Sequence, residues 1–154
     1  MPRHVHATHR IAVDAPIDQA FMYFTPAGEE LWVEGWHPTY VYPGDRQTQA
    51  GMVFTTGQGD DLTIWTLVDF DREAYRSRYV RCTPASRTSV VEIQCTSAGT
   101  ARTDVQVSYT LTALNDAGVR ALEAFEGERY AAMIEGWSRA LAARREALLD
   151  ACIP

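Results

Sequence analysis

Two adjoining stretches decide the fold: Tyr109-Thr-Leu-Thr-Ala-Leu114, and ERYAAMIEGWSRALAARREALLD at 128–150. The first alternates like a strand, and the second predicts a long amphipathic helix that reaches almost to Pro154. On a helical wheel of about 100° per residue, bulky side chains gather within about 60° of one line. They are Tyr130, Met133, Ile134, Trp137, Leu141 and Leu148. The charged Glu128, Glu135, Arg139 and Glu146 lie opposite. So broad a stripe must cover a large apolar surface.

The residues before this helix predict mainly β-strands. Pro16 starts a short helix after the first strand, the Thr25-Pro26-Ala27-Gly28 segment ends it, and a second short helix is expected at 29–34. Strands are expected at 5–13, 39–42, 51–56, 62–70, 74–82, 88–97 and 102–113. An antiparallel sheet with an early helix pair and a late long helix is an α+β domain. A helix that closes the concave face of such a sheet encloses a cavity.

Length and composition narrow the class of protein. At 154 residues, the chain is expected to form one domain over 1–154. A net charge of −6 disfavours nucleic acid and anionic membrane surfaces as partners. No apolar run approaches the ~20 residues that span a bilayer, and the N-terminus does not resemble a signal peptide. Three cysteines, an odd number, fit a reduced cytoplasmic protein.

Several segments of the chain carry a family resemblance. They are Ile11-Ala-Val-Asp-Ala-Pro16, Thr25-Pro26…Glu29…Trp32…Gly35-Trp36…Pro38, Gly51-Met-Val-Phe54, and Tyr109-Thr-Leu-Thr-Ala-Leu114 followed by Gly118. With them the chain resembles the SRPBCC superfamily, which includes START-related, birch-pollen-allergen-like and polyketide cyclase/dehydrase-like proteins. The resemblance implies a helix-grip fold over nearly the whole chain. In that fold a curved antiparallel sheet has two short helices after its first strand, and a long C-terminal helix closes a cavity. Because the family includes carriers, cyclases and proteins with no assigned role, the resemblance says little about chemistry.

Strand alternation predicts which side chains point into the cavity. We assume hairpin loops of four residues at 57–60, three at 71–73 and five at 84–88. One face is then apolar with a few hydroxyls and one arginine: Met52, Phe54, Thr56, Trp65, Leu67, Tyr75, Tyr79, Arg81, Val91, Ile93, Cys95, Val105, Val107, Tyr109 and Leu111. The other face carries Arg76, Arg78, Glu92, Gln94, Asp104, Gln106 and Ser108. The apolar face is therefore expected to point inward.

The inward face and the helix supply the candidate ligand-binding residues. They are Trp36, Tyr40, Phe54, Trp65, Tyr79, Arg81, Tyr109, Met133 and Trp137. Aromatic rings with a few polar tips suit a small hydrophobic molecule. Arg81, near a strand end, could hold a ligand carboxylate or enolate. The alternatives are a solid core without a cavity, and an Arg81 whose stem packs while its head meets water.

The sequence contains no convincing catalytic set. His37, between Trp36 and Pro38, and Arg81 are the candidates for catalysis, because histidine titrates near neutral pH and arginine stabilises an oxyanion. A structural or exposed His37 is the alternative. His4 and His6 share a strand face while His9 points the other way, so no metal site is expected, and no cofactor motif is present.

These observations favour binding or transport of a small hydrophobic molecule that is aromatic, polyketide-like or lipid-like. A cyclase, aromatase or dehydratase type of enzyme that uses the same cavity is one alternative. A surface-mediated protein-interaction module is another. The expected partner is the small molecule alone, without nucleic acid, membrane insertion or cofactor, in a monomer or homodimer.

Overall fold

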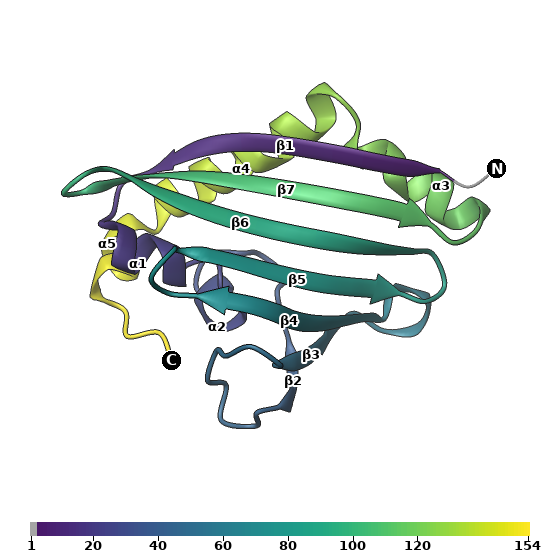
Figure 1. The fold of residues 1–154 in the computed structure, drawn as a ribbon, viewed down its shortest axis with the longest axis horizontal. Coiled ribbons are helices and arrows are strands. Elements are labelled where there is room, and N and C mark those ends of the chain that lie inside the picture. Colours follow the sequence, from purple (N-terminus) through teal and green to yellow (C-terminus); the bar gives the residue numbers. More distant parts are fainter. Residues whose placement is uncertain (1–2) are drawn as a thin grey trace.

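A seven-stranded antiparallel sheet forms the body of the computed structural model, which describes residues 3–154. The strands are β1 (His4–Val13), β2 (Thr39–Tyr42), β3 (Val53–Thr56), β4 (Thr63–Asp71), β5 (Arg76–Thr83), β6 (Arg87–Gly99) and β7 (Arg102–Ala113). Their order in the sheet is β1-β7-β6-β5-β4-β3-β2. Strands β2 to β7 therefore form a meander, and the first strand lies beside the last (Figure 1).

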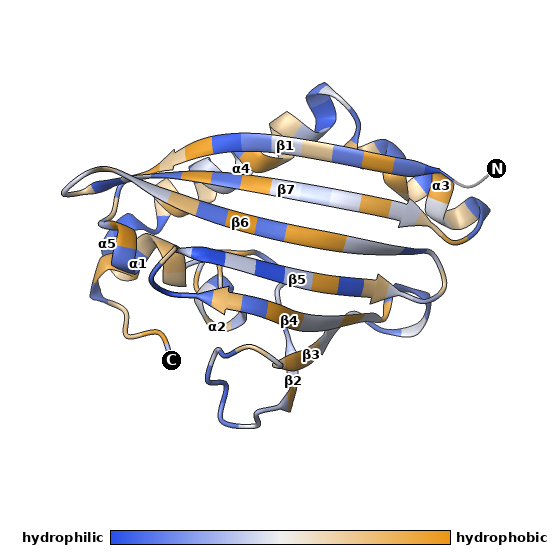
Figure 2. Cartoon of the chain, in the orientation of Figure 1, coloured by the Kyte–Doolittle hydropathy of each residue, from blue (hydrophilic) through white to orange (hydrophobic). Residues whose placement is uncertain are grey.

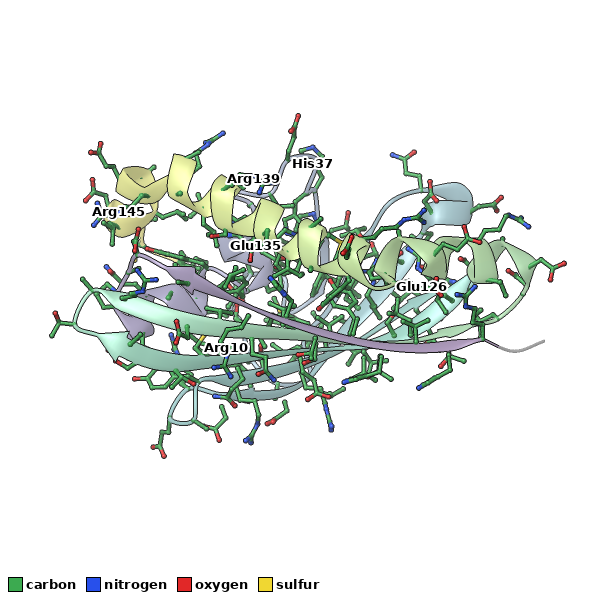
Figure 3. All side chains as sticks on the ribbon, turned by 90° about the horizontal axis from the view of Figure 1, so that it is seen from above. Arg10, His37, Glu126, Glu135, Arg139 and Arg145 are labelled. Atoms are coloured by element: carbon green, nitrogen blue, oxygen red, sulfur yellow. The ribbon has the colours of Figure 1, made fainter. Side chains whose placement is uncertain are left out.

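The α-helices lie together on one face of this sheet (Figures 1 and 3). They are α1 (Ile17–Met22), α2 (Pro26–Glu29), α3 (Asp116–Leu122), α4 (Glu128–Ala143) and α5 (Arg145–Asp150), with single 3₁₀ turns at Gly59–Asp61 and Glu123–Phe125. Helix α4 packs closely against β1. The hydroxyl of Tyr130 in α4 also donates a 2.7 Å hydrogen bond to the Val107 carbonyl of β7. The predicted α+β architecture is confirmed.

The second short helix begins earlier than predicted. The Thr25 hydroxyl accepts a hydrogen bond from the Gly28 amide at 3.1 Å, and Pro26 occupies the first helical position. A threonine N-cap followed by proline is a signal that starts a helix, and we had interpreted it as the end of the preceding one. Helix α2 thus covers Pro26–Glu29, and residues 30–34 form turns.

The C-terminal helix is interrupted, which corrects the prediction of one continuous helix. Arg144, with φ −113° and ψ 15°, separates α4 from α5 and is exposed. The break turns α5 toward α1, where the Gln19 amide donates a 3.3 Å hydrogen bond to the Leu149 carbonyl. Leu141 before the break and Leu148 after it are both buried.

The strand register differs from the one that the assumed loop lengths would give, but each strand keeps its predicted inner face. Thr56 pairs with Thr63 rather than Asp61, which is a shift of two residues. The turn between β4 and β5 is one residue longer than assumed, which by itself would reverse the alternation. A register shift between Leu67 and Asp69 restores it, so Leu67 still pairs with Tyr79. Figure 2 shows the resulting alternation of hydrophilic and hydrophobic residues along the strands.

Candidate ligand-binding cavity

A cavity of about 250 Å³ lies between the concave face of the sheet, α2 and α4. Strands β3 to β7 contribute Phe54, Thr56, Trp65, Tyr79, Arg81, Val91, Ile93 and Tyr109. Helices and their flanking segments contribute Phe24, Pro26, Glu29, Val33, Trp36, Phe125, Met133 and Trp137. The cavity is therefore walled by residues that are far apart in the sequence.

Eight of the nine candidate ligand-binding residues line this cavity, and Tyr40 does not. The Tyr40 ring packs beside Phe54 with 6.4 Å between ring centroids, and its hydroxyl donates a 2.8 Å hydrogen bond to the exposed Glu30. Tyr40 lies on β2, the outermost strand, so its side chain sits beyond Phe54 at the edge of the sheet.

His37 lies outside the cavity. Its side chain is exposed in the segment between α2 and β2, and Figure 3 shows it at the margin of the molecule. The histidine was chosen because it titrates near neutral pH, but its position gives it no contact with the cavity wall.

The aromatic wall is rigidly built. Phe54 and Trp65 stack with 5.4 Å between ring centroids and 11° between ring planes. Trp36 and Tyr79 each stand edge-on to this stack, at 5.5 and 6.1 Å from the Trp65 ring. On the helix side, the Trp137 ring lies 6.5 Å from that of Phe24. Such edge-to-face arrangements fix the rings and leave their apolar surfaces toward the enclosed space.

The polar atoms of three of these rings are already bonded to the protein. The Trp36 indole donates to the Pro26 carbonyl at 2.9 Å, and the Trp65 indole donates to the Thr56 hydroxyl at 3.0 Å. The Tyr79 hydroxyl donates to the Phe24 carbonyl at 3.1 Å. This part of the wall therefore offers a ligand contact area rather than free hydrogen bonds.

Three other residues bring polar groups to the cavity wall. They are Glu29, Arg81 and Tyr109, and we call them the polar cluster. The guanidinium carbon of Arg81 lies 4.4 Å from the centroid of the Trp65 ring. Within residues 3–154, no acidic group lies at ion-pair distance from Arg81, and the Glu29 carboxyl has no hydrogen-bond donor. Arg81 also lies close enough to the Tyr109 hydroxyl to act on it as a hydrogen-bond donor.

The cavity changes the acid–base properties of the polar cluster. Desolvation raises the pKa of Glu29 to about 8, although the positive charge of Arg81 opposes this rise. By surface area Glu29 is half-buried, but it lies in the cavity wall, where the surrounding protein still desolvates the carboxyl group. Burial also raises the pKa of Tyr109, again against the effect of Arg81.

Sequence reasoning did not select Glu29 as a site residue. The signal was present in Thr25 and Pro26: once the helix starts at Pro26, Glu29 ends its single turn. The expected helix at 29–34 placed Glu29 at its start instead, and gave no reason to point its side chain into the cavity.

Among residues 3–154, no group of three or more His, Cys, Asp or Glu side chains is arranged to hold a metal ion. His4 and His6 instead lie on the outer face of the sheet, bonded to Thr112 and Thr110 at 2.9 Å each. No helix within this range is long and apolar enough to cross a membrane.

Several solved structures share this architecture at low sequence identity. Norcoclaurine synthase from Thalictrum flavum, solved in complex with dopamine and hydroxybenzaldehyde, is 14% identical with a TM-score of 0.59, over 93% of this chain and 88% of that chain. A protein from Thermobifida fusca is 16% identical with a TM-score of 0.65, over 94% and 95%. Ara h 8.0201 is 12% identical with a TM-score of 0.64, over 94% and 99%. The chain has the helix-grip fold.

This helix-grip likeness confirms the fold that the sequence resemblance implied, namely that of SRPBCC-type, birch-pollen-allergen-like proteins. No family model matches the sequence, and no curated protein matches it either. At identities of 12 to 16%, the likeness shows the fold alone. The ligand and chemistry of this helix-grip protein must be argued from its own cavity.

Proposed function

We propose that the protein binds a small, largely aromatic hydrophobic molecule in the cavity. The observation that carries this function is the space of about 250 Å³ walled by aromatic rings, in which the indole groups of Trp36 and Trp65 and the hydroxyl of Tyr79 are already bonded to the protein. A cavity of ~150 Å³ is enough to hold benzene, so this one has room for a molecule of about two fused rings. Norcoclaurine synthase, a protein of the same fold, was solved with aromatic small molecules, which supports this class of ligand.

Calorimetric titration with a neutral two-ring compound, 2-naphthylmethanol, tests the binding function. Trp137→Ala removes one wall of the cavity, and we expect it to weaken binding by roughly tenfold or more. Val80→Ala is the control, because Val80 lies on β5 between two lining residues but points to the outer face. The proposal fails if the wild-type protein binds neither this compound nor other neutral two-ring aromatics.

Glu29 supports a second candidate function, proton transfer on the bound molecule. A carboxyl group with a pKa of about 8 exchanges its proton readily near neutral pH, and Arg81 is placed to hold the oxygen of a carbonyl group. In a cyclase or dehydratase type of reaction, Glu29 would move the proton and Arg81 would hold the carbonyl oxygen, whereas His37 does not line the cavity. Deuterium exchange at the methyl group of 2-acetylnaphthalene in heavy water tests it. The wild-type protein should accelerate the exchange, and Glu29→Gln should not.

A further inference from the structure

The polar cluster is the part of the cavity that the protein itself leaves unsatisfied. Tyr109 is nine-tenths buried or more, yet within residues 3–154 its hydroxyl donates to no protein acceptor. The Glu29 carboxyl and the Arg81 guanidinium face the same space from α2 and β5. Buried polar groups are normally hydrogen-bonded, so the buried Tyr109 hydroxyl, together with the half-buried Glu29 and Arg81 side chains at the same space, indicates a ligand with a complementary polar end.

The charge at this end of the cavity is positive near neutral pH. Arg81 is permanently charged. The Nε atom of Arg87 is buried without a partner in the described residues, and Asp61 is the acidic group that acts on Arg87. With a pKa of about 8, Glu29 is mostly protonated at pH 7 and does not cancel this charge.

The other elements around Glu29 add no opposing charge. The groups that face it are Arg81 and Tyr79 from β5 and Tyr109 from β7. Helix α4 contributes only Met133 and Trp137 to the cavity wall. The neighbouring Glu30 is exposed and bonded to Tyr40 and Arg46.

We propose that the cavity selects a small aromatic carboxylate, whose oxygens bind Arg81 and accept hydrogen bonds from the Tyr109 hydroxyl and the Glu29 carboxyl group. This inference rests on the proposed binding function and specifies its ligand class. The aromatic body would lie against Trp36 and Trp137, and the carboxylate would meet the polar cluster. An aromatic amine fits less well, because its ammonium group would meet the positive charge of Arg81, which already lies over the face of Trp65.

The arrangement makes binding depend on pH in a defined direction. When Glu29 ionises, its carboxylate repels the ligand and competes for Arg81, so affinity falls as the pH rises through about 8. Burial raises the pKa of Tyr109 and Tyr79 above 10, and that of Tyr40 to about 12, so these groups keep their protons over this range. The carboxylate ligand itself is ionised throughout.

The experiment compares three ligands of one shape by calorimetry: naphthalene-2-carboxylate, its neutral carboxamide and 2-naphthylmethylamine. We expect the carboxylate to bind roughly 10- to 100-fold more tightly than the carboxamide at about pH 7. Its affinity should fall about tenfold by about pH 9, and Glu29→Gln should abolish that fall. Arg81→Gln should remove the preference for the carboxylate and leave carboxamide affinity within a few-fold. Arg78→Gln, on the outer face of β5, is the matched control, and circular dichroism confirms that each variant is folded.

Other results of this experiment would contradict the ligand class, the role of Glu29 or the binding function itself. If the carboxamide binds as tightly as the carboxylate, or the amine binds more tightly, the ligand class is wrong while the binding function stands. If the pH dependence persists in Glu29→Gln, the role of Glu29 is wrong. If none of the three compounds binds, both the ligand class and the proposed function fail.

Discussion

Polar side chains on the two faces of the sheet differ in their hydrogen bonding. On the outer face, polar groups of neighbouring strands bond to one another: His4 to Thr112, His6 to Thr110 and Thr8 to Ser108, each at 2.9 Å, and Arg76 to Asp69 at 3.2 Å. On the inner face, the polar cluster has no such partners from neighbouring strands and lies beside the bonded rings of Trp36 and Trp65. Polar groups of the outer face thus support the sheet, whereas the polar cluster faces the cavity and can bind another molecule.

The largest expected effect compares two adjacent residues of α4. Ile134 is fully buried in the solid core, and Met133 lines the cavity. Ile134→Ala should lower the free energy of unfolding by about 2–5 kcal/mol, because it leaves a new void in close-packed surroundings. Met133→Ala only enlarges an existing space and should cost about half as much. Urea denaturation followed by circular dichroism measures both; equal losses would mean that the cavity is packed like the core.

Replacing Glu29 should affect stability in a way that depends on pH. Its pKa is raised from 4.5 to about 8, so between these values the folded protein retains a proton that the unfolded chain has lost. Stability therefore falls as the pH rises through this window, and the full cost is present above it. We expect Glu29→Gln to raise the free energy of unfolding by about 2–4 kcal/mol at about pH 9, with no gain near pH 4.

Its neighbour Glu30 provides the control for this measurement. Glu30 is exposed and accepts hydrogen bonds from Tyr40 and Arg46 at 2.8 and 2.6 Å. Glu30→Gln should therefore show no comparable gain at high pH. A Glu29→Gln variant whose stability follows the wild type at every pH would contradict the buried, unmatched carboxyl group.

The smallest effect is expected on the outer face. Arg78 and Glu92 form an ion pair at 3.7 Å, with about half of each side chain exposed. A double-mutant cycle with Arg78→Gln and Glu92→Gln should give a coupling of about 0.2–1 kcal/mol that declines in high salt. A coupling above about 2 kcal/mol would mean that this face is more than a solvated surface.

The order of the helices and strands, and the side chains on the inner face of the sheet, could be predicted from the sequence because they depend on short-range patterns. Alternation in β7 is regular over its whole length, so residues such as Val107 and Tyr109 are assigned to the inner face whatever the loop lengths. For β4 and β5 the correct faces resulted from two compensating differences, the longer turn and the bulge at Val68. Neither is visible as a periodic signal.

The candidate site could be predicted where it depended on strand alternation, and not where it depended on loops. Trp65, Tyr79 and Arg81 lie in the cavity wall because their strands place them there. Glu29 was missed because one capping interaction at Thr25 decides the direction of its side chain. His37 was selected by its chemistry, and chemistry does not fix where an exposed loop residue lies.

The pairing of β1 with β7 has a consequence for how the chain is made. His4 and Thr112, which bond across these strands, are 108 residues apart, so β1 leaves the ribosome long before β7, the strand with which it pairs. The meander from β2 to β6 can form earlier through neighbouring hairpins. Contacts of such long range are slow to form, because the loop must close before they contribute. During translation, β1 is therefore the strand most exposed to aggregation and to chaperones.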